Sequence, residues 1–260
     1  MEWYKKVNPV SSSMFFSCVN LTNVTIPNGV TCIGDSAFSF CAKLMSVAIP
    51  NCVTSIERIA FSYCSSLTSA TIGNGITSIE YGTFCVCQSL TSVTIPNSVT
   101  NIGVGAFEAC YGLTNVTIPN SVTSVGSHAF LLCTNLTAVY FRGNAPGIGF
   151  PAFGNDYKAT VYYLPGTTGW DKWVSPPSAM LWQPLMQTAD GSFGVQTNQF
   201  GFNIAWASGM TVAVDACTNL TTPEWFPLQT NALTADTFYF SDPQWTNYPA
   251  CLYRLRWPGP

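Results

Sequence analysis

The sequence predicts a mostly β protein, in which a solenoid of 23-residue units precedes a small antiparallel β-sandwich. Three observations support this prediction: the chain repeats every 23 residues from Leu21, each unit contains short alternating runs typical of strands, and the composition changes after Tyr163. With 47% apolar and only 8% charged residues, the 260-residue chain can bury a substantial core. Its net charge of −3 and the lack of a basic stripe argue against nucleic acid as a partner.

Two columns of equivalent residues mark the repeat. A partial unit precedes five complete units from Leu21, and a sixth opens at Leu136. The phenylalanine column comprises Phe15, Phe38, Phe61, Phe84, Phe107, Phe130 and Phe153. The cysteine column comprises Cys18, Cys41, Cys64, Cys87, Cys110 and Cys133. Units of this kind cannot bury their apolar residues alone and must stack on their neighbours.

The unit from Leu90 illustrates the expected course of the chain. Residues 90–96 (LTSVTIP) alternate as a short strand with one face inward, and Pro96-Asn97 ends that strand. A second extended run at 99–102 faces the same interior, and Gly103 permits another turn. Residues 106–110 form a tight helical or 3₁₀ turn that leads back to the next unit. Stacked units then pair their strands in parallel at a spacing of about 4.8 Å.

The cysteine column has two interpretations. Stacked thiols about 5 Å apart at Cα satisfy a crude disulfide distance. Equivalent side chains on successive coils run parallel, however, whereas a bridge needs the two sulfurs to face each other. We therefore expect a structural ladder of free thiols that pack as small apolar side chains. No metal is expected, because zinc sites use cysteines spaced within one turn.

Asparagine forms a further column at the turn that ends each long strand. Its members are Asn28, Asn51, Asn74, Asn97 and Asn120. Asparagine suits such turns, so we expect its side chains to hydrogen-bond the turn and their own stack. A direct role in binding is the alternative.

The outward residues of the long strands predict a flat and almost uncharged face. One outward column comprises Thr25, Ala48, Thr71, Thr94, Thr117, Tyr140 and, one residue short of the period, Tyr162. A neighbouring column comprises Thr22, Met45, Thr68, Thr91, Thr114 and Thr137. Threonine is a good strand residue, so both columns have a purely structural interpretation. The alternative is a protein-binding face made of Thr25, Thr71, Thr94, Thr117, Tyr140 and Tyr162, with Tyr140, Phe141 and Tyr162 as aromatic anchors.

The string LTSVTIPNSVTNIGVGAFEAC resembles the BspA-like leucine-rich repeats of bacterial, and some protist, surface proteins. The resemblance covers about residues 15–164, and we place the solenoid at 1–164, with a partial first unit, about six further units and a cap. It implies an extracellular or cell-surface protein that binds another protein, a matrix component or a neighbouring surface. Residues 1–13 show no apolar segment after Lys5 and Lys6, so no signal peptide is legible, and we expect the chain to be a fragment.

The remaining residues predict a Pro- and Trp-rich linker at 165–190 and a β-sandwich at 191–260. The stretch from Val214 to Pro258 resembles tail modules of secreted, multi-domain proteins of Verrucomicrobia-type bacteria. Cys217 and Cys251 can form a bridge there if their strands are adjacent. Four tryptophans could include a platform for sugar stacking, although most are expected in the core. They are Trp206, Trp225, Trp245 and Trp257.

Catalysis is not expected, because titratable groups that converge are lacking. The one histidine, His128, falls in a variable turn position, and no known catalytic or nucleotide-binding motif is present. Glu57 and Glu80 share a repeat column but are expected on an outer turn, in water. We expect no cofactor, and no apolar stretch approaches the roughly 18 residues of a membrane span.

The sequence leaves three hypotheses of function. The first is a non-enzymatic scaffold for protein interaction or adhesion, which binds through the strand face of the solenoid. The second is a carbohydrate-binding protein that acts through the C-terminal module. The third is a passive spacer at the cell surface.

Overall fold

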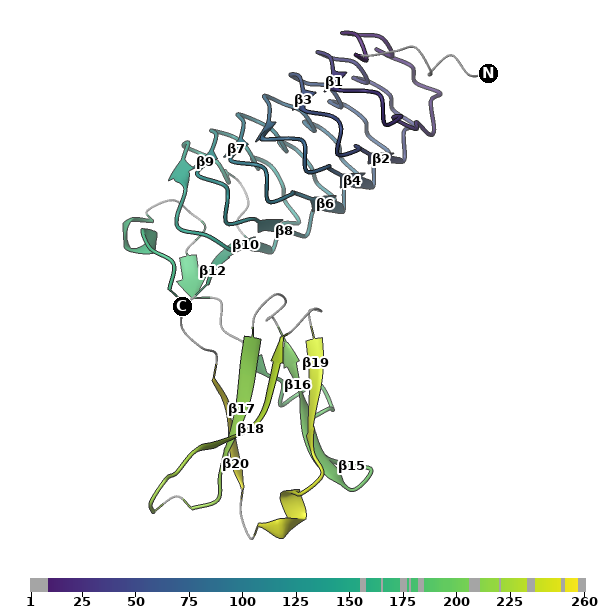
Figure 1. Cartoon of the computed structure of the whole chain (residues 1–260). Coiled ribbons are helices and arrows are strands. Elements are labelled where there is room, and N and C mark those ends of the chain that lie inside the picture. The colour runs from purple at the N-terminus through teal and green to yellow at the C-terminus, as the bar shows by residue number, and fades with distance from the viewer. Residues whose placement is uncertain are drawn as a thin grey trace. The chain divides into compact units, whose positions relative to one another are not determined.

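A computed structural model describes residues 9–154, 158–164, 166–173, 177, 179–181, 185–205, 211–219, 221–232, 237–248 and 251–256. The chain divides into two compact units, Met1–Met180 and Leu181–Pro260 (Figure 1). The first is a solenoid of parallel strands, and the second consists of antiparallel sheets. The predicted fold class, a mostly β solenoid followed by antiparallel strands, is confirmed.

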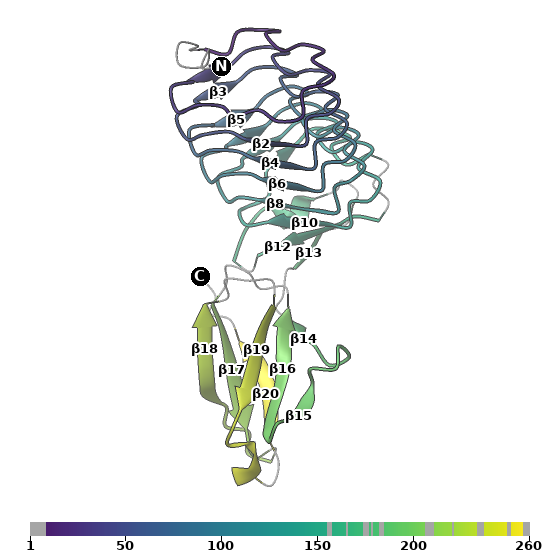
Figure 2. The same cartoon turned by 90° about the vertical axis from the view of Figure 1, so that its right-hand side faces the viewer.

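The longer strands of the solenoid follow one another along one side of the coils (Figure 2). They are β2 (Ser46–Ala48), β4 (Ser69–Thr71), β6 (Ser92–Thr94), β8 (Asn115–Ile118), β10 (Ala138–Phe141), β12 (Thr160–Tyr163) and β13 (Ala179–Leu181). They form two sheets in the orders β2-β4-β6 and β8-β10-β12-β13. The pairs from β2 to β6 and from β8 to β12 are parallel, with equivalent residues opposite each other, as in Val47 and Ala70. This register places every second side chain in the core and its neighbours on the outer face.

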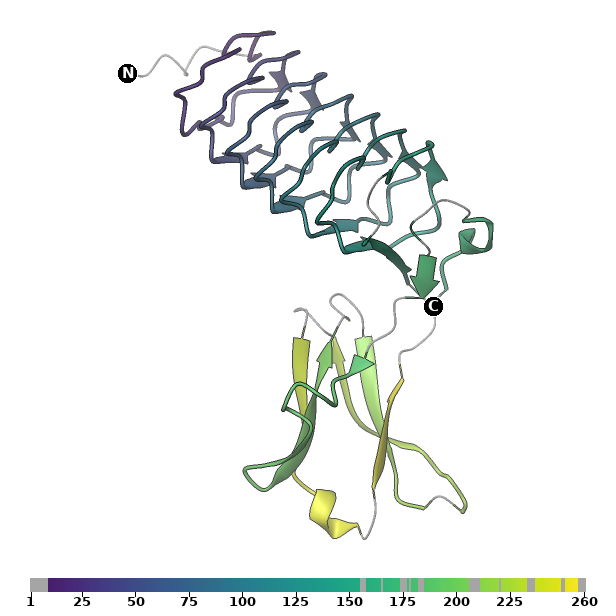
Figure 3. The same ribbon diagram turned by 180° about the vertical axis from the view of Figure 1, so that it is seen from behind.

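A second set of two-residue strands lies on another side of the same coils (Figure 3). It comprises β1 (Cys32–Ile33), β3 (Ser55–Ile56), β5 (Ser78–Ile79), β7 (Asn101–Ile102), β9 (Ser124–Val125) and β11 (Gly147–Ile148). Their inward residues, such as Ile56 and Ile102, are buried in the same core as the longer strands. The sequence therefore placed both extended runs of the unit correctly.

The third segment of each coil is a series of tight turns. Bonds from a backbone N–H to the carbonyl three residues earlier are those of 3₁₀ turns, as in Cys110 to Phe107 at 3.3 Å. Alternate N–H groups instead donate to the next coil, as from Phe107 to Ala129 at 2.8 Å. Two residues per coil have left-handed φ angles, for example 61° at Gly105 and 56° at Ala109. These residues redirect the chain, so the turns never extend into a helix.

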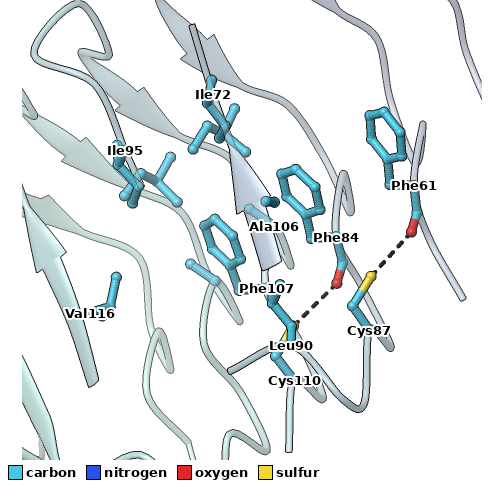
Figure 4. Packing of buried hydrophobic residues seen from close by; sticks show 14 of the residues in the cluster. Phe61, Ile72, Phe84, Cys87, Leu90, Ile95, Ala106, Phe107, Cys110 and Val116 are labelled. Carbon is cyan, nitrogen blue, oxygen red and sulfur yellow. Dashed lines mark hydrogen bonds between the residues drawn. The ribbon is translucent and has the colours of Figure 1, made fainter. Parts of the chain in front are cut away.

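The core between these three sides contains a continuous stack of phenylalanine rings (Figure 4). Consecutive rings from Phe15 to Phe153 lie 5.0 to 5.6 Å apart and within 11° of parallel. Fully buried leucines two residues before a long strand, such as Leu90 before β6 and Leu113 before β8, complete the layer. The repeat of the sequence thus becomes a repeat of identical contacts, each coil covering its neighbour's apolar face.

Aromatic side chains close the core at the C-terminal coils. The 3₁₀ turn η2 (Trp170–Lys172) brings Trp170 onto the ring of Tyr163, at a centroid distance of 4.8 Å. Trp170 also meets Phe141 edge-on at 5.2 Å, and its indole N–H donates to the Thr167 hydroxyl. Trp173 packs against the same core. Residues within the predicted linker therefore contribute to the solenoid core.

The second unit has two antiparallel sheets. The first contains β14 (Leu185–Met186), β15 (Gly194–Gln196), β16 (Gln199–Ala205) and β19 (Thr237–Asp242), and the second contains β17 (Thr211–Cys217), β18 (Phe226–Ala232) and β20 (Leu252–Arg256). A 3₁₀ turn, η3 (Trp245–Asn247), follows β19. The Tyr253 ring of β20 stacks on Phe200 and meets Phe202 and Phe240 edge-on, which joins the two sheets.

An ion-pair cluster lies on strands β17 and β20. The buried Asp215 carboxylate accepts hydrogen bonds from Arg256 at 2.8 Å and from Arg254 at 3.1 Å. These guanidinium groups, with Arg256 the stronger, hold the pKa of Asp215 below its usual range despite its burial. The Arg254 guanidinium also lies 4.4 Å from the ring centroid of Trp225. The cluster links the edge strand β20 to the centre of its sheet.

Candidate functional site

The predicted face residues lie on the outer side of consecutive long strands. Thr71 and Thr94 are exposed and paired across β4 and β6. Thr117 on β8 is half-buried and is paired with Tyr140, which is in turn paired with Tyr162. The remaining member, Thr25, is exposed on a coil that precedes β2. The structure thus brings five of the six predicted residues into one row on two neighbouring sheets.

Two open grooves follow this row where the strands end. The first has a volume of about 840 Å³ and the second about 310 Å³. The first is lined by Asn28, Ile49, Pro50, Asn51, Cys52, Thr71, Ile72, Gly73, Asn74, Thr94, Ile95, Pro96 and Asn97. The second is lined by Ser92, Val93, Thr94, Ile95, Asn97, Asn115, Val116, Thr117, Pro119 and Arg142. Because they share Thr94, Ile95 and Asn97, we treat them as one feature, the strand-end groove.

The strand-end groove is polar but almost uncharged. Of all its lining residues only Arg142 carries a charge, and its side chain is exposed. Arg142 forms no ion pair with any carboxylate in the part of the chain that the structure describes. The groove therefore offers hydroxyl and amide groups along its length and one unpaired cation toward its C-terminal end.

The neighbouring threonine column has a structural role. The Thr91 hydroxyl donates to the Thr68 carbonyl at 3.1 Å, and the Thr137 hydroxyl donates to the Thr114 carbonyl at 3.0 Å. A third column, which lies immediately before the two-residue strands, behaves in the same way, as in Thr100 to Thr77 at 3.2 Å. These hydroxyls tie successive coils together, which supports the structural interpretation for these columns. By contrast, the hydroxyls of the groove threonines make no hydrogen bond to other described residues.

The asparagine column forms part of the groove wall. The Asn51 side-chain oxygen accepts a hydrogen bond from the Asn74 N–H at 2.8 Å, and Asn144 plays the same part for Thr168 at 2.9 Å. The expectation that these side chains hydrogen-bond their own stack is confirmed for the Asn51–Asn74 pair. Since its oxygen is used in this way, the amide nitrogen of Asn51 remains available as a donor.

Two of the three predicted aromatic anchors lie on the face, and the third does not. Tyr140 and Tyr162 are half-buried and their rings stack at 5.3 Å. The prediction that Phe141 is an anchor was wrong, because Phe141 is only 1% exposed and packs in the solenoid core. The reason is the alternation of the strand, which turns Tyr140 outward and its neighbour inward.

The cysteine column lies beside the phenylalanine stack. The side chains of Cys41, Cys64, Cys87, Cys110 and Cys133 are buried. Each thiol donates to the carbonyl oxygen of the phenylalanine 26 residues earlier at 3.2 Å, as Cys87 does to Phe61 (Figure 4). Burial raises the pKa of Cys64 to about 12 and holds those of Cys87 and Cys110 well above the usual range. Cys18, in the first described coil, is exposed.

The thiols of this column are therefore expected to resist alkylation in the folded protein. With iodoacetamide at mildly alkaline pH, Cys18 should be labelled quickly, whereas Cys64, Cys87 and Cys110 should react only after denaturation. The physical reason is that a buried thiol with a raised pKa supplies almost no thiolate. Mass mapping of the labelled peptides provides the measurement. Labelling of Cys87 as fast as Cys18 would contradict the arrangement.

The second unit presents a weaker case for a site. Trp225 is partly covered by Arg254, and the Trp245 indole donates to the Asn198 carbonyl at 3.3 Å. The other two candidate tryptophans, Trp206 and Trp257, lie outside the described residues. Strands β17 and β20 are adjacent, as a disulfide required, but Cys217 is opposite Leu252 and both thiols, Cys217 and Cys251, are free.

Catalytic or metal-binding clusters do not emerge from the described ranges. No group of three or more His, Cys, Asp or Glu side chains there could hold a metal ion. Glu57 and Glu80 lie on the turn side of the coils and not in the strand-end groove. Within the same ranges, no helix has the length and apolar character needed to cross a bilayer.

Stacked coils with parallel strands identify the first unit as a repeat protein of the solenoid type, here with a polar groove where the long strands end. The model of the BspA type leucine rich repeat region matches residues 1–111 and 54–168, with 6 copies, and the chain belongs to this family. Leucine-rich-repeat proteins are in general scaffolds for protein interaction and are not usually enzymes. No curated protein matches the chain.

Several solved structures are similar to part of the chain. A leucine-rich repeat protein from Bacteroides ovatus is 26% identical over 60% of this chain and 47% of its own, with a TM-score of 0.48. The T. pallidum leucine rich repeat protein is 26% identical over 61% and 67%, with a TM-score of 0.40. A leucine rich cell surface protein from Faecalibacterium prausnitzii is 22% identical over 65% and 66%, with a TM-score of 0.31. The chain spans about half the length of the first of these proteins.

Sequence reasoning missed Arg142 and the asparagine wall as parts of the groove. Arg142 follows the outward Tyr140 by two residues, so strand alternation alone already placed it on the same face. The asparagine column was visible, but its proximity to the threonine row depends on how sharply the Pro-Asn turn bends. That bend is a tertiary feature that the repeat does not reveal.

Proposed function

We propose that this protein is a non-enzymatic scaffold that binds another protein through the strand-end groove. The observation that supports this best is the groove itself, in which Thr71, Thr94 and Thr117 line an open, polar surface beside the asparagine column. Hydroxyls in the other threonine columns are used to join coils, whereas those in the groove are available to a partner. The stacked Tyr140 and Tyr162 provide a rigid aromatic surface at one end.

We further propose that the partner lies outside the cell, as a matrix or cell-surface component. This proposal rests on the BspA-like repeat, whose resemblance implies a surface protein. Fractionation of producing cells, followed by proteolysis of intact cells, tests it. Detection of the chain only in a protected, intracellular fraction would overturn it.

Replacing Thr71, Thr94 and Thr117 with Glu is expected to abolish partner binding while the fold persists. Three charged side chains would occupy the groove, but their Cβ positions stay on the outward face of the long strands. Thr94→Trp is a second variant that fills the groove without adding charge, because Thr94 lines both parts of the strand-end groove. Capture from spent medium or host matrix on the immobilised chain measures binding, and circular dichroism checks the fold.

The matched control places the same three charges immediately before the two-residue strands, at Thr54, Thr77 and Thr100. These threonines are exposed and lie outside the groove. The control variant should bind as the original chain does. Equal binding by the groove variants and the control variant would contradict the proposal.

Carbohydrate binding by the second unit is the other candidate, supported by Trp225 with Arg254 stacked on its ring. We rank it lower because that contact occupies one surface of the indole. A glycan array probed with the full chain and with Trp225→Ala separates the two functions. Glycan binding that is lost in Trp225→Ala and retained in Thr94→Trp would favour the second unit.

A further inference from the structure

The charge of the strand-end groove points to the chemistry of its partner. Arg142 is the one charged side chain among the lining residues, and no carboxylate lines either part of the groove. A guanidinium presents a planar fork of donors that matches a carboxylate in two parallel hydrogen bonds. Exposed and without an ion pair among the described residues, Arg142 is available for such a contact.

The neutral residues of the groove favour the same kind of partner. The oxygen of Asn51 is already used by Asn74, so its amide nitrogen is left to donate. Thr71 and Thr94 hydroxyls can donate as well. The Asn51 amide nitrogen can only donate, so it favours oxygen acceptors such as peptide carbonyls and carboxylates, whereas the threonine hydroxyls can both donate and accept.

The shape of the groove favours an extended segment. It runs across coils from Asn28 to Arg142, where neighbouring strands repeat at about 4.8 Å. The stacked Tyr140 and Tyr162 lie on the same face as Arg142, so an apolar residue of the partner would pack beside its acidic one. The protein itself has a net charge of −3, so an acidic partner gains nothing from long-range attraction and depends on the local cation.

We propose that the strand-end groove binds an extended acidic peptide segment of a partner protein, with an Asp or Glu carboxylate on Arg142. This inference rests on the proposed function and names the partner's chemistry at the same site. Arg142 is the contact that distinguishes acidic from neutral segments. The threonines and asparagines of the groove hold the backbone whatever its sequence.

The experiment uses the full chain and two synthetic peptide libraries of equal length, random except for one position. That position is Asp or Glu in the first library and Asn or Gln in the second. The acidic library should be retained about tenfold more strongly. This preference should disappear in Arg142→Glu and persist in Arg58→Glu, because Arg58 lies on the turn side, over the Tyr81 ring. Fluorescence polarisation of the selected peptides gives the affinities.

The possible outcomes separate this inference from the proposed function. Peptides can bind without acidic preference, and Thr94→Trp can abolish their binding while Arg142→Glu does not. This result leaves the groove as the binding site and overturns the acidic partner. An acidic preference unchanged in Arg142→Glu overturns it as well. Retention of polygalacturonate, with no peptide retained, assigns the cation to an anionic glycan and overturns both. Lysines are avoided in this test because they would themselves attract an acidic peptide.

Discussion

Phe84→Ala is expected to lower the free energy of unfolding of the solenoid by about 3–5 kcal/mol. The Phe84 ring is fully buried and stacks between Phe61 at 5.6 Å and Phe107 at 5.5 Å. Removing it leaves a void in the middle of the stack, so both neighbouring coils lose contacts. In a repeat protein, stability depends on such interfaces between adjacent units, and a central break affects both halves. Chemical denaturation followed by far-ultraviolet circular dichroism measures the loss.

The control for Phe84→Ala is Tyr111→Ala, which removes an aromatic side chain that is 38% exposed on the turn side. Its effect should stay within about 0.5 kcal/mol, as for most surface substitutions. If both variants lost the same stability, the phenylalanine stack would not be the main contribution to the core.

Trp170→Ala is expected to cost about 3–5 kcal/mol as well, but its effect should be confined to the last coils. Trp170 is 7% exposed and covers the core by stacking on Tyr163 and meeting Phe141 edge-on. Without it, the apolar ends of β10 and β12 would be open to water. Amide hydrogen exchange should accelerate in β10 and β12 and remain slow in β2 and β4, since each coil depends on its nearest neighbours.

Lys172→Ala in the same 3₁₀ turn serves as its control, because the Lys172 side chain is exposed. Exchange in β10 and β12 should then match that of the original chain. Uniformly faster exchange across all coils in Trp170→Ala would contradict a local closing role.

Much of the solenoid could be predicted because the apolar residues that recur in each unit are the residues of its core. The phenylalanine column, the inward isoleucines and the shortened spacing that pairs Tyr140 with Tyr162 all follow from counting residues. These features depend on contacts between equivalent positions. A one-dimensional pattern is sufficient to assign them.

Other features depend on backbone geometry that residue type does not reveal. Ile59 and Val86 have left-handed φ angles of 48° and 59°, which β-branched residues rarely adopt. In the following coil, Gly82 takes the position of Ile59, and a Cβ there would lie 2.7 Å from the Ile59 side chain. The coil stacking imposes these angles, so no local preference predicts them.

The candidate site was predictable only in part for a similar reason. Strand alternation gives the outward threonines, but the wall formed by Asn51 and Asn74 arises where a turn bends back beside them. Phe141 shows the opposite error, since its aromatic character suggested an anchor while the strand turns it into the core. The outward residues of a strand are therefore easier to predict than the groove that they form with a neighbouring turn.

The most direct test of the account is photo-crosslinking of the full chain from single positions. A small aliphatic residue with a diazirine group, close to leucine in size and far smaller than the blocking tryptophan, replaces Thr94 in the groove or, in a separate variant, Thr100 just before β7. With host matrix or spent medium as the source of partners, the groove position should give a discrete crosslinked protein and Thr100 should give none. Crosslinks of equal yield from both positions, or from Thr100 alone, would contradict the central claim that the strand-end groove is the binding surface.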